Sequence, residues 1–300
     1  MIRDYDCKPE DSDQEMLEVI QKYALPIPEI YTERDQIIRF ALLEKEESPK
    51  PYCTIPFDHT LEAEALGGSV RYGSDTSGPR AKEPVCKSLE ELQSLPEIDF
   101  SNGRIGEVLS ACRSLREQGE EVLFQMSGPL TIWNTLTDLK YVLKGIRKSP
   151  EQMEALFRKT GQELLRLLEE LKKAGVRMVS YADSAGSLMI LGPKSMEWMT
   201  RVFTDPFLQR AADILGENMA MILCPKTAFA MTGTGLAREA CLELPGEMTY
   251  QEACVYAVGK AKFPAQMCIN RSRTVIKTGK LVTIEIKEKE DRSDCPQGQQ

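Results

Sequence analysis

Histidine is almost absent from this chain of 300 residues, which contains a single one, His59. A metal site built from three histidines is therefore excluded. A triad of serine, histidine and aspartate could be assembled only around that residue. Aromatic residues are also few, at 7%, but a hydrophobic share of 42% is enough to bury a substantial core. The composition predicts a globular protein with one large domain or two small ones.

Long hydrophobic runs and an excess of positive charge are missing too. No stretch approaches the roughly 20 apolar residues that span a bilayer, and the start of the chain is too polar and too acidic for a signal peptide. With 38 Lys and Arg against 46 Asp and Glu, the net charge is -8, which does not suit a surface that neutralises phosphates. We therefore expect a cytoplasmic protein that binds neither membranes nor nucleic acid.

The sequence also lacks closely paired cysteines and a glycine-rich phosphate loop. Its nine cysteines form an odd, scattered set, which argues against a disulfide framework. In a reducing compartment each cysteine is either a small core residue or a thiolate with a function. Because no glycine-rich loop follows an early strand, a dinucleotide-binding fold has no fingerprint here.

Short apolar runs alternate with helical periods along most of the chain, which predicts an α/β fold with a parallel sheet and helical crossovers. The clearest helix begins at Ser149-Pro150 and ends near Ala174-Gly175. The strands fit a TIM-type (β/α)8 barrel or a doubly wound sheet, and the missing phosphate loop favours the barrel. Strands are expected at 52–57, 69–72, 122–126, 177–181, 219–224, 240–244 and 265–269.

The two ends of the chain differ from its middle. Residues 1–50 are charged and predict a helical N-terminal extension, which ends at a proline-containing turn. The barrel is expected over residues 51–270, either complete or shortened at its C-terminus. Residues 271–300 begin with an alternating segment about Thr278-Gly279, which predicts a β-hairpin followed by a polar, frayed tail.

Polar residues that directly follow predicted strands are the functional candidates, because barrel enzymes carry their sites at the carboxyl ends of the strands. Asp58 and His59 could orient a substrate or move its proton, and His59 could equally orient a loop. Glu62 and Glu64 are further acid and base candidates, or a solvated helix face. The other candidates on this face are Ser127, Gly128 and Ser184, expected to bind substrate, and Asp183, Cys224 and Cys268.

Asp183, Cys224 and Cys268 together form a reasonable zinc set. Zinc accepts sulfur and oxygen ligands, and a catalytic site needs only three ligands from the protein. Such an ion is a Lewis acid that withdraws electron density from a substrate oxygen, nitrogen or thiol. Ligands on separate strands leave no local signature, so the alternative that the cysteines are structural stays open.

Four segments resemble the uroporphyrinogen decarboxylase superfamily: PFDHTLEAEALGG, GPLTIWNTLTDL, VRMVSYADSAGSLMILGPKSMEWM and LCPKTAFAMTGTGLA. The resemblance runs from about residue 52 to 270 and is closest to the branch of corrinoid-dependent methyltransferases, which belong to anaerobic one-carbon metabolism. It implies a TIM barrel, zinc, and a corrinoid (cobalamin) carried by a partner protein. The implied reaction moves a methyl group between a small methylated substrate or acceptor and the cobalt of that corrinoid protein, in a direction that stays open.

The ligand pattern of this family is only partly present. Members that methylate coenzyme thiols bind zinc through an H-x-C pair and a distant cysteine. Cys224 matches the first cysteine, but Ile222 stands where the histidine is expected. The resemblance therefore implies either that Cys268 replaces the second cysteine or that the metal is lost. Asp183, which matches the family's A-D pair, could take the histidine's role.

Two other functions stay open. Decarboxylases of the family have an essential aspartate nine residues before a glycine, and counting back from Gly67 leads to Asp58. This match predicts a carbon-carbon lyase as the alternative, although the arginine-rich N-terminal motif that holds the substrate's carboxylates is missing. The changed ligand position also fits a non-catalytic member of the fold.

Overall fold

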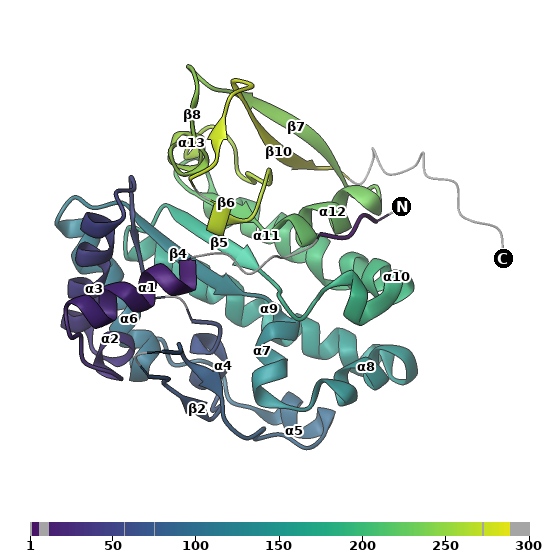
Figure 1. Cartoon of the computed structure of the whole chain (residues 1–300). Helices are drawn as coiled ribbons and strands as arrows, with labels where there is room; N and C mark the ends of the chain where they lie inside the picture. The colour runs from purple at the N-terminus through teal and green to yellow at the C-terminus, as the bar shows by residue number, and fades with distance from the viewer. Residues whose placement is uncertain (1, 6–11, 57, 75, 272, 289–300) are drawn as a thin grey trace.

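The structure, a computed structural model, describes residues 2–5, 12–56, 58–74, 76–271 and 273–288. It is an α/β protein with a parallel sheet at its centre (Figure 1), which confirms the predicted class. None of the helices in these ranges is long and apolar enough to cross a membrane.

The central sheet has four parallel strands in the order β1-β4-β5-β6. These strands are β1 (Cys53–Thr54), β4 (Val122–Ser127), β5 (Met178–Ala182) and β6 (Ala220–Leu223). Every side chain of β6 is buried, as expected of a parallel strand covered on both faces. The predicted strands at these four places are confirmed, and their carboxyl ends meet at one edge of the sheet.

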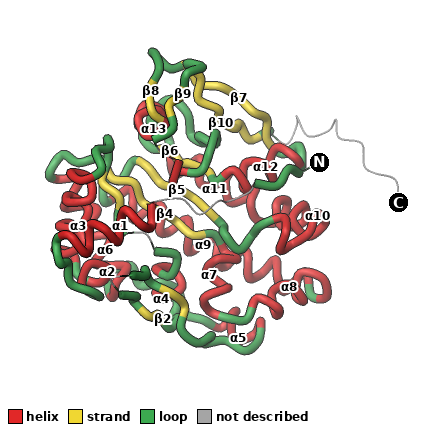
Figure 2. Tube along the Cα trace, in the orientation of Figure 1, coloured by secondary structure: helices red, strands yellow, loops and turns green. Residues whose placement is uncertain are grey.

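Helices connect the strands and cover the sheet (Figure 2). The longest is α9 (Pro150–Lys173), which confirms the predicted helix. Its apolar residues recur every three or four positions and lie in the main hydrophobic core. The other helices are α1 (Ser12–Lys22), α2 (Glu29–Thr32), α3 (Arg34–Glu47), α4 (Leu61–Ala65), α5 (Leu89–Ser94), α6 (Gly103–Glu117), α7 (Pro129–Leu136), α8 (Leu139–Lys148), α10 (Leu188–Met199), α11 (Asp205–Leu215), α12 (Pro225–Gly233) and α13 (Tyr250–Ala257), with a π-helical turn at Thr200–Thr204 and a 3-10 turn at Ile269–Arg271.

Side chains of the central strands alternate between two buried clusters, because successive residues of a strand point to opposite faces. Phe124, Val179 and Leu223 belong to the main core, which α9 and α11 also line. Leu123 and Ile222 belong to the second cluster, which α13 and the C-terminal strands complete. The sheet is therefore buried on both faces.

The remaining strands are antiparallel, which differs from the prediction of further barrel strands. β7 (Ala237–Glu243) pairs with β10 (Lys280–Ile286), and β2 (Val70–Arg71) pairs with β3 (Arg80–Ala81). Residues 265–269 do not form a strand in the described chain. The preceding residues instead accept hydrogen bonds from β6, at the carbonyls of Lys262 and Pro264.

The predicted hairpin about Thr278-Gly279 is wrong. The strands on its two sides exist, but β9 (Val275–Ile276) pairs with β8 (Met248–Thr249) and β10 pairs with β7. Pairing with β7 engages all seven residues of β10. A hairpin would have paired β10 with β9, which has only two residues. The predicted tail from residue 289 lies outside the described residues.

The N-terminal region forms the helices α1, α2 and α3, as expected. They share a small apolar cluster of their own, which includes Ile20, Ile30 and Phe40. Their last member, α3, also places Ile37 and Ala41 in the main core. The division into an extension of residues 1–50, a barrel and a C-terminal segment stays a prediction.

Candidate functional site

Candidate residues lie where the carboxyl ends of the four parallel strands meet. Asp58 and His59 follow β1, Ser127 ends β4, Asp183 follows β5 directly, and Cys224 follows β6. This is the shared edge at which they were expected. Gly128 lies beside Ser127, and Ser184 is exposed next to Asp183.

Both carboxylate oxygens of Asp183 accept hydrogen bonds. Its Oδ1 accepts hydrogen bonds from the Thr131 amide and hydroxyl, both at 2.8 Å, and its Oδ2 accepts one from the Leu130 amide at 3.2 Å. Burial raises the pKa of Asp183, and the hydrogen bonds from Thr131 and Leu130 lower it. Because both donors lie in the first turn of α7, Asp183 ties the end of β5 to the start of that helix.

Gly128 allows this close approach. A Cβ at this position would lie 2.4 Å from the Asp183 Cβ and 2.8 Å from the Tyr181 hydroxyl. We expect Gly128→Ala to lower the free energy of unfolding by about 1–3 kcal/mol, since overpacking must push Asp183 or Tyr181 out of place. Urea denaturation measures the change. Gly246→Ala is the control, because no atom lies within 4 Å of its added Cβ; equal stability of the two variants would contradict the prediction.

The predicted zinc ligands do not form a metal site in this structure. No group of three His, Cys, Asp or Glu side chains in the described part of the chain is placed to hold a metal ion. Asp183 is engaged with α7, and Cys268 directly precedes the 3-10 turn Ile269–Arg271 rather than following a strand. Ile222, at the position of the expected histidine, is buried in the apolar second cluster. The donor set therefore does not fit zinc.

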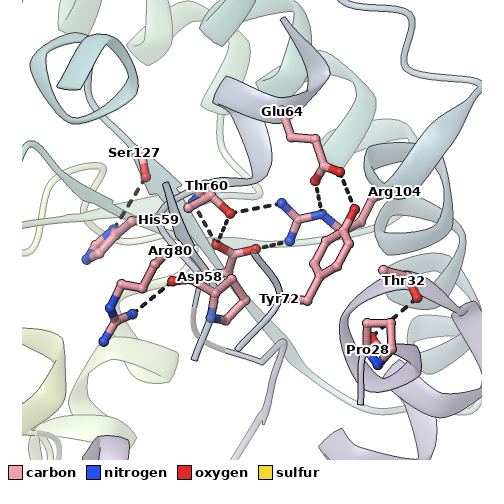
Figure 3. A network of polar contacts seen from close by, with 11 residues as sticks. Pro28, Thr32, Asp58, His59, Thr60, Glu64, Tyr72, Arg80, Arg104 and Ser127 are labelled. Carbon is pink, nitrogen blue, oxygen red and sulfur yellow. Dashed lines mark hydrogen bonds and ion pairs between the residues drawn. The ribbon is translucent and has the colours of Figure 1, made fainter. Parts of the chain in front are cut away.

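Asp58 takes part in a buried network centred on Arg104 of α6 (Figure 3). The Arg104 guanidinium pairs with the carboxylates of Asp58 and Glu64. Thr60 donates its amide and hydroxyl hydrogens to Asp58, and the Tyr72 hydroxyl donates to Glu64. Both carboxylates thus have charged partners within the protein. Arg104 was not among the predicted site residues, because its partners precede it by 46 and 40 positions.

His59, Ser127 and Glu62 form a second polar group beside this network. The Ser127 hydroxyl lies 3.5 Å from the His59 Nδ1 (Figure 3), and the Ser127 amide donates to Glu62 Oε1 at 2.9 Å. Glu62 is 0% exposed, so the interpretation of this glutamate as part of a solvated helix face is wrong. Its Oε2 is buried without a hydrogen-bond partner among the described residues.

Burial raises the pKa of Glu62 to about 7, an effect that the nearby Asp58 increases and that Arg104 and the hydrogen bond from Ser127 reduce. Tyr181 is also fully buried next to this group, and its pKa is raised by burial and by the charges of Asp183, Cys224 and Glu62. The carboxyl ends of the strands therefore hold a carboxyl group that is about half protonated at neutral pH. Such groups are typical of sites that transfer protons.

The raised pKa of Glu62 makes stability depend on pH. As pH rises above 4.5, the unfolded chain releases this proton before the folded protein does, so the free energy of unfolding falls until pH passes about 7. Glu62→Gln removes this dependence. We expect the stability of the variant relative to the wild type to increase by about 2–3 kcal/mol between about pH 5 and pH 8, at 1.36 kcal/mol per pKa unit. Urea denaturation across this range tests it, and parallel curves would contradict it.

Comparison with known proteins provides a family and a fold. The sequence profile of the uroporphyrinogen decarboxylase (URO-D) family matches residues 15–237. The methylcobamide:CoM methyltransferase MtaA of Methanosarcina barkeri is 22% identical over 215 residues, which cover 70% of this chain and 62% of that protein. MtbA of Methanosarcina mazei, of the same description, is 35% identical over 81 residues, 26% of this chain and 24% of its own length.

A solved structure, a methyltransferase from Methanosarcina mazei, superposes with a TM-score of 0.62 at 22% identity. The alignment covers 73% of this chain and 66% of that structure. At this identity the likeness shows the fold alone. The chain spans less than two thirds of the length of MtaA and of the solved structure.

Proposed function

This chain belongs to the uroporphyrinogen decarboxylase family, and we propose that it is an enzyme that moves a methyl group between a small methylated compound or acceptor and the cobalt of a corrinoid protein. The names of its methyltransferase relatives support this reaction. The observation that carries the proposal is the group of buried polar residues at the carboxyl ends of the parallel strands, where barrel enzymes hold their sites.

The proposed fold is a shortened barrel. Four parallel strands form its wall, and the carbonyls of Lys262 and Pro264 continue the hydrogen bonding beyond β6. The antiparallel pair β7 and β10 follows along that side, since Ala265 donates to Val282 and Ile284 donates to Phe263. A corrinoid protein would approach the edge that carries His59 and Ser127.

The proposed chemistry relies on the chain's own residues and assigns no step to zinc, since Asp183, Cys224 and Cys268 do not form a ligand set. His59 and Ser127 would orient the small substrate. Gly128 would keep the backbone after β4 close to Asp183. Asp183 would act indirectly, by fixing the start of α7 against β5. Cys224, which caps α12 at the same edge, would border the substrate.

The alternatives receive less support from the geometry. A lyase that relies on Asp58 needs a carboxylate directed at the substrate, but both Asp58 oxygens are engaged by Thr60 and Arg104. A non-catalytic protein has no need for a buried carboxyl group with an unpartnered oxygen, which lowers stability without improving packing. Both observations favour a catalytic site other than Asp58.

Methyl transfer is tested with the full chain in both directions. Methylcobalamin and a small thiol test methylation of an acceptor, and cobalamin reduced to Co(I) with a methyl ether tests demethylation. The absorbance change between the two cobalamin forms reports transfer. Saturable, protein-dependent transfer in either direction is the expected result. Transfer in neither direction, with cobalamin shown to be reactive toward methyl iodide, would overturn the proposed function.

A further inference from the structure

Four carboxyl groups lie at or near the carboxyl ends of the parallel strands. In three of them both oxygens accept hydrogen bonds or ion pairs from the protein. Asp183 accepts three hydrogen bonds from α7. Asp58 and Glu64 share the Arg104 guanidinium, with Thr60 and Tyr72 as further donors. None of these three has an oxygen left over for a substrate.

Glu62 differs from the other three. Its Oε1 is fixed by the Ser127 amide, while its Oε2 has no hydrogen-bond partner among the described residues and is completely buried. The carboxyl group is thus oriented by one oxygen, which leaves the other oxygen, shielded from solvent, to carry its proton. Its anchor, Ser127, is also the residue whose hydroxyl faces His59.

We propose that Glu62 is the proton donor of the methyl transfer, and that the substrate is a methyl donor whose leaving atom must take up a proton, such as the oxygen of a methyl ether. This inference rests on the proposed function. A protonated carboxyl group assists an oxygen leaving group, whereas methylation of a thiol requires a proton to be removed.

The charged and titratable groups around Glu62 are consistent with this role. Tyr181, Asp58 and Arg104 are the titratable and charged groups that act on Glu62. His59 is linked to it through Ser127. Burial and Asp58 raise the pKa of Glu62, and Arg104 lowers it, with a result of about 7. The group therefore holds a proton in a large share of molecules at neutral pH and can lose it without a large energetic cost.

The proposed step balances as follows. The Co(I) centre of a corrinoid, as co-substrate, donates an electron pair to the methyl carbon and is formally oxidised to Co(III). The carbon-oxygen bond breaks with its electron pair on oxygen, and the proton of Glu62 moves to that oxygen to give an alcohol or a phenol. Glu62 is left as a carboxylate, and it recovers a proton once the product has left and water reaches the site.

The test compares two methyl donors that differ in their need for a proton. The leaving group of methoxybenzene is phenoxide, which must take up a proton. The leaving group of tetramethylammonium is a neutral amine, which takes up none. Transfer to Co(I) cobalamin is measured for the wild type, Glu62→Gln and the control Glu163→Gln. Glu163 is a buried glutamate on α9 that pairs with Arg166 and the Ile98 amide, away from the strand ends.

We expect Glu62→Gln to slow transfer from methoxybenzene by about 100-fold to 10,000-fold, the usual contribution of a general acid, and to leave transfer from tetramethylammonium within about threefold. The wild-type rate with methoxybenzene should fall as pH rises through about 7, and that decline should be absent from the variant. Glu163→Gln should match the wild type with both donors.

Several results would overturn this role. Equal losses with both donors would show that Glu62 only maintains the structure, and unchanged rates would show that it donates no proton. Transfer from methylcobalamin to a thiol, with none from methoxybenzene, would reject the role of Glu62 but retain methyl transfer. Transfer in neither direction would overturn both proposals. Infrared spectroscopy adds a readout without turnover: a protonated carboxyl band absent from Glu62→Gln is expected at pH 7, and its absence from the wild type would reject the role.

Discussion

Replacing Arg104 with methionine is expected to lower the free energy of unfolding by about 3–5 kcal/mol, the usual cost of removing one partner from a buried ion pair. Arg104 is 4% exposed at its side chain, and the paired Asp58 is 7% exposed. Without the guanidinium, Asp58 and Glu64 would remain close together in a poorly solvated place. Urea denaturation at neutral pH gives the change.

Two further variants separate charge from packing in this prediction. Arg201→Met removes an arginine whose partner Glu197 is half exposed, so it should cost less than about 1 kcal/mol. Adding Asp58→Asn and Glu64→Gln to Arg104→Met should recover part of the loss, because no uncompensated charge then remains. A triple variant as unstable as the single one would show that the network contributes packing rather than charge balance.

Asp183→Ala is expected to cost about 3 kcal/mol or more. The substitution leaves the amides of Leu130 and Thr131 and the Thr131 hydroxyl without their acceptor, and each buried unsatisfied donor costs about 1–3 kcal/mol. The first turn of α7 should then open more often. Hydrogen exchange of the Leu130 and Thr131 amides should accelerate, and unchanged exchange of both would contradict the proposed tie between β5 and α7.

Asp183→Asn is the matched variant for this tie. Its Oδ1 can still accept from Thr131, but its amide nitrogen would face the Leu130 amide, so one hydrogen bond is replaced by a contact between two donors. Exchange should therefore accelerate at Leu130 and stay slow at Thr131.

The choice between Asp58 and Glu62 as the reactive carboxyl group depends on whether the protein already balances the charge of each. Asp58 satisfies the spacing that predicted a lyase, yet Arg104 balances its charge within the protein. Glu62 satisfies no such spacing, yet it is the buried carboxyl group with an unpartnered oxygen at this edge. Burial and hydrogen bonding thus point to Glu62 rather than to Asp58, the residue that motif spacing favoured in the same segment of the chain.

Periodic and local features of the sequence determined the class of this fold. The spacing of apolar residues after Pro150 is enough to define α9, because helical packing depends on a period of 3.6 residues. Four buried runs are enough to define the parallel strands, and the polar residues that follow them share one edge because parallel strands end on the same side. The family resemblance is carried by the same segments.

Only the tertiary structure decided the pairings between distant residues. The hairpin about Thr278-Gly279 is locally reasonable, but β10 gains a longer ladder with β7, whose residues precede their partners by 37 to 49 positions. Arg104 reaches Asp58 from α6, and Asp183 reaches α7 from β5; neither contact leaves a pattern in the sequence. The sequence by itself determined the class of fold, the family and the edge at which the candidate residues gather. The tertiary structure decided which carboxyl groups are neutralised and which one keeps a proton, because desolvation and hydrogen bonding depend on neighbours that the sequence does not place together.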